Sequence, residues 1–218
     1  MDVVIAGGHG QIALALTRLL RTRGDGVRGL IRNPAHADDL REAGAQPVLC
    51  DLEALSEDEI AAAIGPADAF VFAAGAGPGS GPERKRTLDF QGVEKTIAAA
   101  KANGIARYVI VSSMGTADPP QDDDTFSVYL RAKADADDAL RASGLDYTVV
   151  RPGGLTNDPP TRRVRIGASL PHETVTRADV AGVLVAVLDE PTSIGTTFEL
   201  LNGETPVAEA LTAFLATR

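Results

Sequence analysis

Short runs of apolar residues alternate along the chain with segments in which apolar residues recur every three or four positions. The short runs predict buried strands, and the periodic segments predict amphipathic helices. Strands are expected at residues 3–6, 27–31, 47–50, 68–73, 107–112, 146–150 and 198–201, with at most a small strand around residues 164–166. A first helix is expected from the glycine turn to a stop at Gly24, and further helices are expected at residues 34–40, 55–64, 83–103, 126–142, 179–188 and 207–216. This order predicts an α/β protein built from βα units around a parallel sheet.

The first strand runs directly into a glycine-rich turn, and the turn opens the first helix. Gly7 permits a tight turn, Gly10 lets the backbone approach a pyrophosphate, and Ala13 lets the helix pack on the strand. The first amides of a helix have no intrahelical acceptor and would face the phosphates. The pattern favours a dinucleotide-binding turn over a purely structural turn. We expect cofactor contacts from Gly7, Gly8, His9, Gly10, Gln11 and Ile12.

The second expected strand ends at Arg32, about twenty residues after the glycine turn. A carboxylate at that place would accept a hydrogen bond from the ribose 2′-hydroxyl of NAD. Arginine cannot accept this bond, but its guanidinium fits a 2′-phosphate. The sequence therefore favours NADP(H) over NAD(H), with a solvated surface charge as the alternative for Arg32.

Three other strand ends carry candidate ligand contacts. Asp51 and Leu52 follow the third strand, and Asp51 either bonds the adenine amino group or begins the next helix. Small residues after the fourth and sixth strands let the backbone approach a ligand closely: Ala73, Ala74, Gly75, Pro152, Gly153 and Gly154. The Gly/Pro/Ser run at residues 74–82 predicts a loop at the ligand-binding edge of the sheet, either a lid or a mobile linker.

Tyr129 and Lys133 are spaced to lie on the same helix face, one turn apart. A tyrosine phenol has a reference pKa of about 10, so it is a poor base at neutral pH. A nearby ammonium and an oxidised nicotinamide both favour the phenolate. Lys133 would supply that ammonium and bond the nicotinamide ribose, while a serine of the Ser112-Ser113 pair would hold a substrate oxygen. Tyr129 would then exchange a proton with that oxygen as hydride moves at the ring.

The chain resembles the short-chain dehydrogenase/reductase superfamily in a series of motifs that follow one another in its order. They are Gly7-x-x-Gly10-x-x-Ala13, Arg32, Asp51-Leu52, Ala73-Ala74-Gly75, Ser112-Ser113, Tyr129-x-x-x-Lys133 and Arg151-Pro152-Gly153. The glycine spacing and short C-terminal part are similar to the atypical branch, the small NAD(P)H-binding proteins such as NmrA and biliverdin reductase B. The resemblance covers essentially the whole chain. It implies a single Rossmann-type, doubly wound parallel sheet with helices on both faces and a cofactor at the C-terminal edge of the sheet. It also implies Tyr129 as acid/base with Lys133 as its partner, and Ser113, or else Ser112, as the family serine.

Composition and charge narrow the functional classes. The 218 residues suffice for one domain, 1–218, in which residues 153–175 and the C-terminal segment form a small substrate-side lobe. The net charge of −9 argues against a nucleic-acid-binding surface. The single cysteine, Cys50, excludes an intrachain disulfide and is expected in the core, and the three scattered histidines have no metal-ligand spacing. No apolar run reaches the ~18 residues of a membrane span and no targeting segment is visible, so we expect a cytoplasmic protein.

The sequence leaves three kinds of function open. The first is an NADP-dependent oxidoreductase acting on a small carbonyl or quinone, or an epimerase or dehydratase-like enzyme that uses its bound cofactor transiently. The second is a redox sensor that binds NADP(H) without chemistry, and the third is an interaction protein on a vestigial fold. About sixty residues follow the sixth strand, too few for a large sugar-nucleotide lobe, so we expect a small-molecule substrate. The pattern does not distinguish a monomer from a homodimer.

Overall fold

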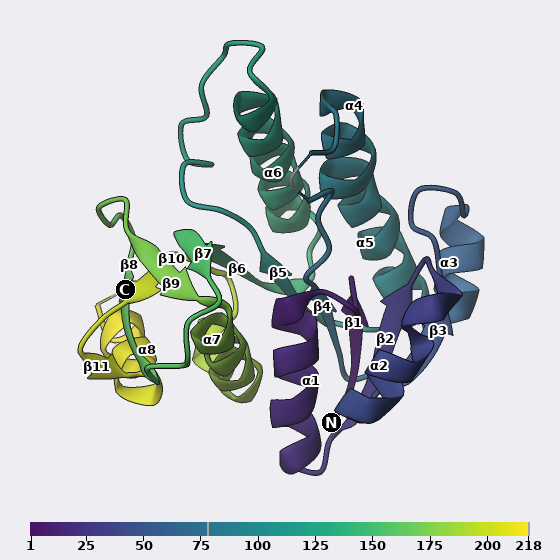
Figure 1. The fold of residues 1–218 in the computed structure, drawn as a ribbon, viewed down its shortest axis with the longest axis horizontal. Coiled ribbons are helices and arrows are strands. Elements are labelled where there is room, and N and C mark those ends of the chain that lie inside the picture. The colour runs from purple at the N-terminus through teal and green to yellow at the C-terminus, as the bar shows by residue number, and fades with distance from the viewer. Residues whose placement is uncertain (78, 218) are drawn as a thin grey trace.

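A computed structural model describes residues 1–77 and 79–217 (Figure 1). Within these residues the main sheet has nine strands in the order β11-β8-β10-β6-β5-β4-β1-β2-β3. Its strands are β1 (Asp2–Ala6), β2 (Gly26–Ile31), β3 (Gln46–Leu49), β4 (Ala69–Phe72), β5 (Arg107–Val111), β6 (Asp146–Pro152), β8 (Arg163–Gly167), β10 (Thr196–Asn202) and β11 (Thr205–Pro206). A separate two-stranded sheet pairs β7 (Gly154–Thr156) with β9 (Thr174–Thr176).

The helices connect successive strands. The α-helices are α1 (Gln11–Thr22), α2 (Ala37–Ala43), α3 (Glu57–Ile64), α4 (Pro82–Arg84), α5 (Gly92–Ala102), α6 (Thr125–Ala142), α7 (Arg177–Asp189) and α8 (Val207–Leu215). Short 3₁₀ helices are η1 (Pro34–His36) and η3 (Pro191–Ser193), and a π-helical segment, η2 (Lys85–Gln91), joins α4 to α5.

The chain runs outward from β1 to β3 and then returns to place β4 on the other side of β1. All pairings from β3 to β10 are parallel, and only β8 pairs antiparallel with β10 and β11. The predicted doubly wound, largely parallel sheet is therefore confirmed. Its topological switch point lies between β1 and β4, where open α/β sheets bind ligands beyond the carboxyl ends of the strands.

Alternate residues of the central strands face two separate apolar layers. Val3 and Ile5 of β1 belong to one buried cluster with side chains of α1 and α7. Val4 and Ala6 belong to a second cluster with side chains of α3, α5 and α6. In Figure 1, α1 and α7 stand together on one side of the sheet, and α3, α5 and α6 stand on the other. Helices on both faces leave the carboxyl ends of the strands open at one edge.

Local contacts fix the ends of several helices. Thr176 caps α7 by accepting a hydrogen bond from the Asp179 amide, and Asp124 caps α6 in the same way through the Phe126 amide. Gly44 ends α2 in the left-handed conformation, at φ 97°. Cys50 is buried as expected. Among the described residues, none of the helices is long and apolar enough to cross a membrane.

Three expectations need correction. The expected 83–103 helix is not uniformly α-helical, because η2 lies between α4 and α5. Residues 163–167 form a full strand, since pairing with β10 and β11 supplies backbone partners that apolar content alone did not indicate. Asp51 does not begin a helix, because α3 starts six residues later behind a Ser56–Glu59 capping box. Pro78, in the loop considered as a lid, lies outside the described residues.

Candidate functional site

The glycine turn joins β1 to α1 and lies against the ends of β2 and β4. Gly7 has a φ of 73°, and a Cβ there would come within 2.6 Å of the Ala74 Cα, so only glycine fits. Gly8 donates its amide to the Leu30 carbonyl (2.9 Å). Gly10 caps α1 without a side-chain hydrogen bond. The start of α1, with Gln11 and Ile12, therefore carries backbone amides that no capping side chain occupies.

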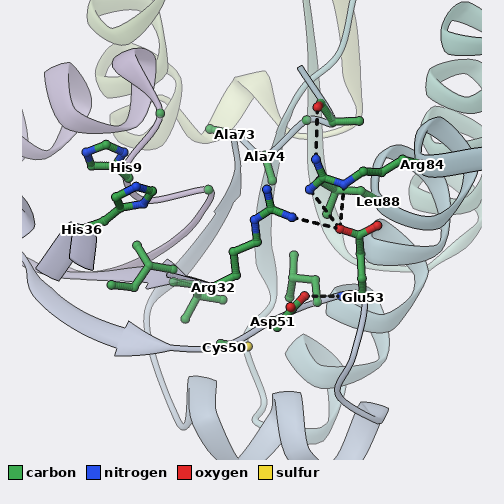
Figure 2. A pocket seen from close by; sticks show the side chains of 17 residues that line it. His9, Arg32, His36, Cys50, Asp51, Glu53, Ala73, Ala74, Arg84 and Leu88 are labelled. Atoms are coloured by element: carbon green, nitrogen blue, oxygen red, sulfur yellow. Dashed lines mark hydrogen bonds and ion pairs between the residues drawn. The ribbon is translucent and has the colours of Figure 1, made fainter. Parts of the chain in front are cut away.

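A cavity of about 320 Å³ begins at this turn and extends along the carboxyl ends of β1, β2, β3 and β4 (Figure 2). It brings together many of the residues predicted to bind the cofactor: Gly7, His9, Gly10, Arg32, Asp51, Leu52, Ala73, Ala74 and Gly75. Other lining residues were not predicted from the sequence: Leu30, Ile31, His36, Cys50, Glu53, Ala76, Arg84 and Leu88. The cavity thus lies where the sequence predicted the cofactor, at the glycine turn and the ends of the neighbouring strands.

The two histidines of the cavity stack on each other. The ring centroids of His9 and His36 are 3.7 Å apart and their planes differ by 13°. His9 Nε2 lies 2.7 Å from the Asp39 carboxylate at the start of α2. This contact links the glycine turn to the segment that follows Arg32. The sequence separation of 27 positions between the rings explains why the pattern of residues did not indicate the pair.

Three charged side chains meet on the opposite wall of the cavity (Figure 2). Arg84 Nη2 lies 2.9 Å from Glu53 Oε2, and its Nε donates a hydrogen bond of 2.9 Å to the same oxygen. Arg32 Nη1 lies 3.7 Å from that oxygen. Thr87 donates its hydroxyl to the other carboxylate oxygen of Glu53 (2.7 Å). Glu53 lies only two positions beyond Asp51, whose carboxylate accepts the Glu53 amide (3.0 Å).

Lys133 is buried on α6 and held by η2 and β5. Its Nζ lies 3.4 Å from the fully buried Asp89 and donates a hydrogen bond of 3.1 Å to the Val111 carbonyl. Asp89 also accepts the Ala76 amide (3.1 Å), directly after β4. Burial disfavours the charge of Lys133, but the carboxylate of Asp89 with other nearby groups outweighs it and holds the Lys133 pKa above its usual value. The charged Lys133 side chain therefore connects α6 to η2 and to the end of β5.

Tyr129 lies one turn before Lys133 and contacts a second lysine. Lys85 Nζ stands 5.3 Å from the centre of the Tyr129 ring, and the Phe126 ring stacks on it at 5.8 Å. Lys85 is itself buried and donates a hydrogen bond of 2.8 Å to the Gly77 carbonyl. The phenol ring is thus bordered by Lys85 of η2, a neighbour that the Tyr-x-x-x-Lys spacing did not predict.

The two serines after β5 have different surroundings. Ser112 is buried, and its amide donates to the Val150 carbonyl (2.8 Å). Ser113 is partly exposed and its hydroxyl donates to the Met114 carbonyl (3.0 Å). Nearby, the Asp137 carboxylate accepts a hydrogen bond from Arg151 Nε (3.0 Å). Burial raises the pKa of Asp137, and the positive charge of Arg151 offsets only part of this increase. The buried Asp137–Arg151 pair holds α6 on β6 beside both serines.

The residues after β6 approach the protein's own backbone. A Cβ on Gly153 would lie 2.3 Å from the Glu173 carbonyl, and the Gly153 amide donates to Leu200 (3.0 Å). Gly154 donates to Glu173 (2.9 Å). Pro152, Gly153 and Gly154 do not line the cavity, and neither do Tyr129, Lys133, Ser112 and Ser113. Among the described residues, no three His, Cys, Asp or Glu side chains are grouped to hold a metal ion.

The chain is similar to known proteins in sequence and in fold. The family model described as NAD(P)H-binding matches residues 7–191. The uncharacterized sugar epimerase YhfK of Bacillus subtilis (strain 168) is 39% identical over 212 residues, which are 97% of this chain and 99% of that protein. Sanguinarine reductase of Eschscholzia californica is 33% identical over 174 residues, 74% of this chain and 60% of the reductase.

A solved structure from Bacillus halodurans, provisionally named an NAD-dependent epimerase/dehydratase, is 40% identical. It superposes with a TM-score of 0.91 and covers 98% of this chain and 100% of its own. These similarities span the strands, the glycine turn and the C-terminal segment alike. They confirm the resemblance drawn from the sequence motifs.

Proposed function

Because the chain belongs to the NAD(P)H-binding family, with epimerase- and reductase-named relatives, we propose that it is an NADP(H)-dependent oxidoreductase. Its substrate would be a small carbonyl or quinone-like molecule. The observation that carries the cofactor choice is Arg32, a guanidinium in the wall of the cavity where an NAD-binding protein would need a carboxylate. The described residues fit such a cofactor, because the cavity starts at a turn that only glycine can make.

The chain's residues would bind and orient the dinucleotide as follows. The first amides of α1 would face the pyrophosphate, as helix N-termini do for anions. Arg32 would pair with the 2′-phosphate, and Asp51 would accept a hydrogen bond from the adenine amino group. The nicotinamide, when bound, supplies or accepts a hydride. Lys133, tied to Asp89, would hold α6 against the ends of β4 and β5.

Tyr129 would move the proton that accompanies the hydride. Its place on α6 one turn from Lys133 supports this role, and Ser113 or Ser112 would hold the substrate oxygen. The same residues suit an epimerase or dehydratase that oxidises its substrate transiently, as the names of two relatives suggest. A sensor that binds NADP(H) without turnover is the third possibility, and it would not need the Tyr129 hydroxyl.

A titration with NADPH and NADH, followed by nicotinamide fluorescence, tests the cofactor proposal. We expect NADPH to bind more tightly than NADH. Arg32→Ala should weaken NADPH binding by about tenfold or more, because a charge-assisted bond to phosphate is lost, and should change NADH binding little. Arg41→Ala, an exposed arginine paired with Asp38 outside the cavity, is the matched control. Absence of binding of either dinucleotide would refute the proposal.

A screen of small carbonyls and quinones with Tyr129→Phe tests the acid/base proposal. Loss of the phenol hydroxyl should leave the NADPH dissociation constant unchanged and lower kcat at least about 100-fold, the usual size of a general acid/base contribution. Tyr147→Phe, on β6, is the control. Unchanged kcat in Tyr129→Phe would remove Tyr129 from the chemistry. A wild-type protein that binds NADPH but turns over no substrate would support the sensor.

A further inference from the structure

Glu53 is the common partner of both arginines that line the cavity. Both guanidiniums point at its carboxylate in Figure 2, one from the end of β2 and one from α4. They converge on a single atom, Oε2. An anion is therefore already built into the wall of the cavity, beside the guanidinium that would receive a 2′-phosphate.

The two arginines are not held equally. Arg84 makes two contacts of 2.9 Å to Glu53, and its Nη1 donates a further bond of 3.4 Å to the Ala76 carbonyl. Thr87 fixes the other oxygen of the carboxylate. The Glu53–Arg84 pair is thus anchored to the Ala76 carbonyl and to the Thr87 hydroxyl. It is a fixed part of the wall.

Arg32 is the loosely held member. Its contact with Glu53 is 3.7 Å long, and its side chain is 56% exposed. An ion pair of this length and exposure contributes little free energy, because water and salt screen it. A phosphate group near Arg32 can therefore take the guanidinium away from Glu53, at a cost of at most about fivefold in affinity. An uncharged ribose hydroxyl does not attract the guanidinium to a comparable extent.

We propose that Glu53 sets the preference of the site between dinucleotides with and without a 2′-phosphate, by competing for Arg32, and that Arg84 limits this competition by neutralising Glu53. The inference rests on the proposed function, since it concerns the same cavity. Glu53 weakens the binding of a 2′-phosphate in two ways: it competes with the phosphate for Arg32, and it repels the phosphate directly. Both effects scale with the charge that Arg84 leaves uncompensated. NADH, which places no phosphate there, is insensitive to both.

Two single variants test the role of Glu53 and the role of Arg84. Glu53→Gln keeps the shape and one acceptor oxygen but removes the charge, so NADPH should bind about fivefold more tightly, the upper range for an exposed pair. Arg84→Met should weaken NADPH binding about tenfold, because Glu53 then lies beside the phosphate without the neutralising charge of Arg84. NADH affinity should stay within about twofold in both variants, and this retained binding also reports that each variant is folded.

The double variant decides between a screening role and a direct role for Arg84. With glutamine at position 53 there is no charge to neutralise, so adding Arg84→Met to Glu53→Gln should change NADPH affinity by less than about twofold. A tenfold loss that persists in the double variant would mean that Arg84 binds the phosphate itself, and would overturn the proposal. Glu83→Gln and Arg86→Met are the controls, since both residues are exposed on the same helical segment and do not line the cavity.

Adenosine fragments locate the effect. Adenosine 2′-monophosphate and adenosine 5′-monophosphate compete with NADPH, and only the former should gain affinity in Glu53→Gln. A weaker NADH affinity in Glu53→Gln would show that the carboxylate binds ribose hydroxyls, which overturns the proposal. Wild-type protein that binds neither dinucleotide would overturn the proposed function and this inference together. If the wild-type protein binds the dinucleotides but Glu53→Gln has the same ratio of NADPH to NADH affinity, the inference alone would be overturned.

Discussion

Cys50 gives a residue-scale test of the cavity floor. It is 3% exposed and lines the cavity, and burial together with Asp51 raises the pKa of its thiol from 9.0 to about 11. At pH 8 this lowers the reactive thiolate about 100-fold. We therefore expect a thiol-reactive dye to label the folded protein at least about 100-fold more slowly than the same chain in urea, measured by absorbance.

The labelling experiment has its own internal control. Because the chain holds one cysteine, all of the signal comes from Cys50. Raising the pH toward 11 should speed labelling of the folded protein, since the thiolate fraction grows until the pH passes the raised pKa. Equal rates for folded and unfolded chains at pH 8 would show that the thiol is exposed.

The sequence indicated those site residues that a strand end places at the ligand edge. Gly7, Arg32 and Asp51 each follow directly from a strand, so their location depends only on recognising the strand. Glu53 and Arg84 could not be found in this way. Their pairing depends on how the segment after β3 packs against α4. The position of Glu53, two residues after Asp51, does not by itself indicate a role in the site.

At the scale of elements, Arg107 at the start of β5 ties neighbouring segments together. Its guanidinium donates to the Asp146 carbonyl (2.7 Å), the Thr148 hydroxyl (2.9 Å), the Val187 carbonyl (3.0 Å) and the Ser193 hydroxyl (2.9 Å). These partners belong to β6, α7 and η3. Burial lowers the pKa of Arg107 to about 10, so the side chain remains charged at neutral pH.

Arg107→Met should lower the free energy of unfolding by about 2–3 kcal/mol, since buried acceptors lose their charged donor. Urea denaturation with an unchanged m-value measures this loss. Arg141→Met removes an exposed arginine that pairs only locally with Asp138, and should cost less than about 0.5 kcal/mol. A similar cost for both variants would mean that Arg107 does not connect the elements.

Elements with a strong apolar period were predictable, and short or irregular ones were not. The central strands follow from runs such as Val3–Ala6 and Val109–Val111, which are buried on both faces. Strands β7, β9 and β11 have two or three residues, too few for any period to appear. The π-helical turn in η2 has no sequence signature either, because its residues also fit an α-helix.

At the scale of the whole molecule, the parallel sheet with two helical layers follows from the alternation of strands and helices. The alternation also places the glycine turn at the switch point, because β1 is central. The sequence did not predict how the C-terminal segment closes the sheet. Its strand β8 adds antiparallel to β10, so that Gly153 and Gly154 meet the segment carrying Glu173.

The π-helical segment lets one long helix hold an extra residue without turning its two ends relative to each other. A π-turn holds one residue more than an α-turn, because each of its residues turns the chain by less than the about 100° of an α-helix. Deleting one residue between Lys85 and Gln91 would therefore restore an α-helical hydrogen-bond ladder and leave α4 and α5 nearly in their present orientation. Arg84 would keep its contact with Glu53, and Val93 would keep its packing. The same deletion within α5 would rotate the two ends by about 100°, because that helix has no extra residue to lose.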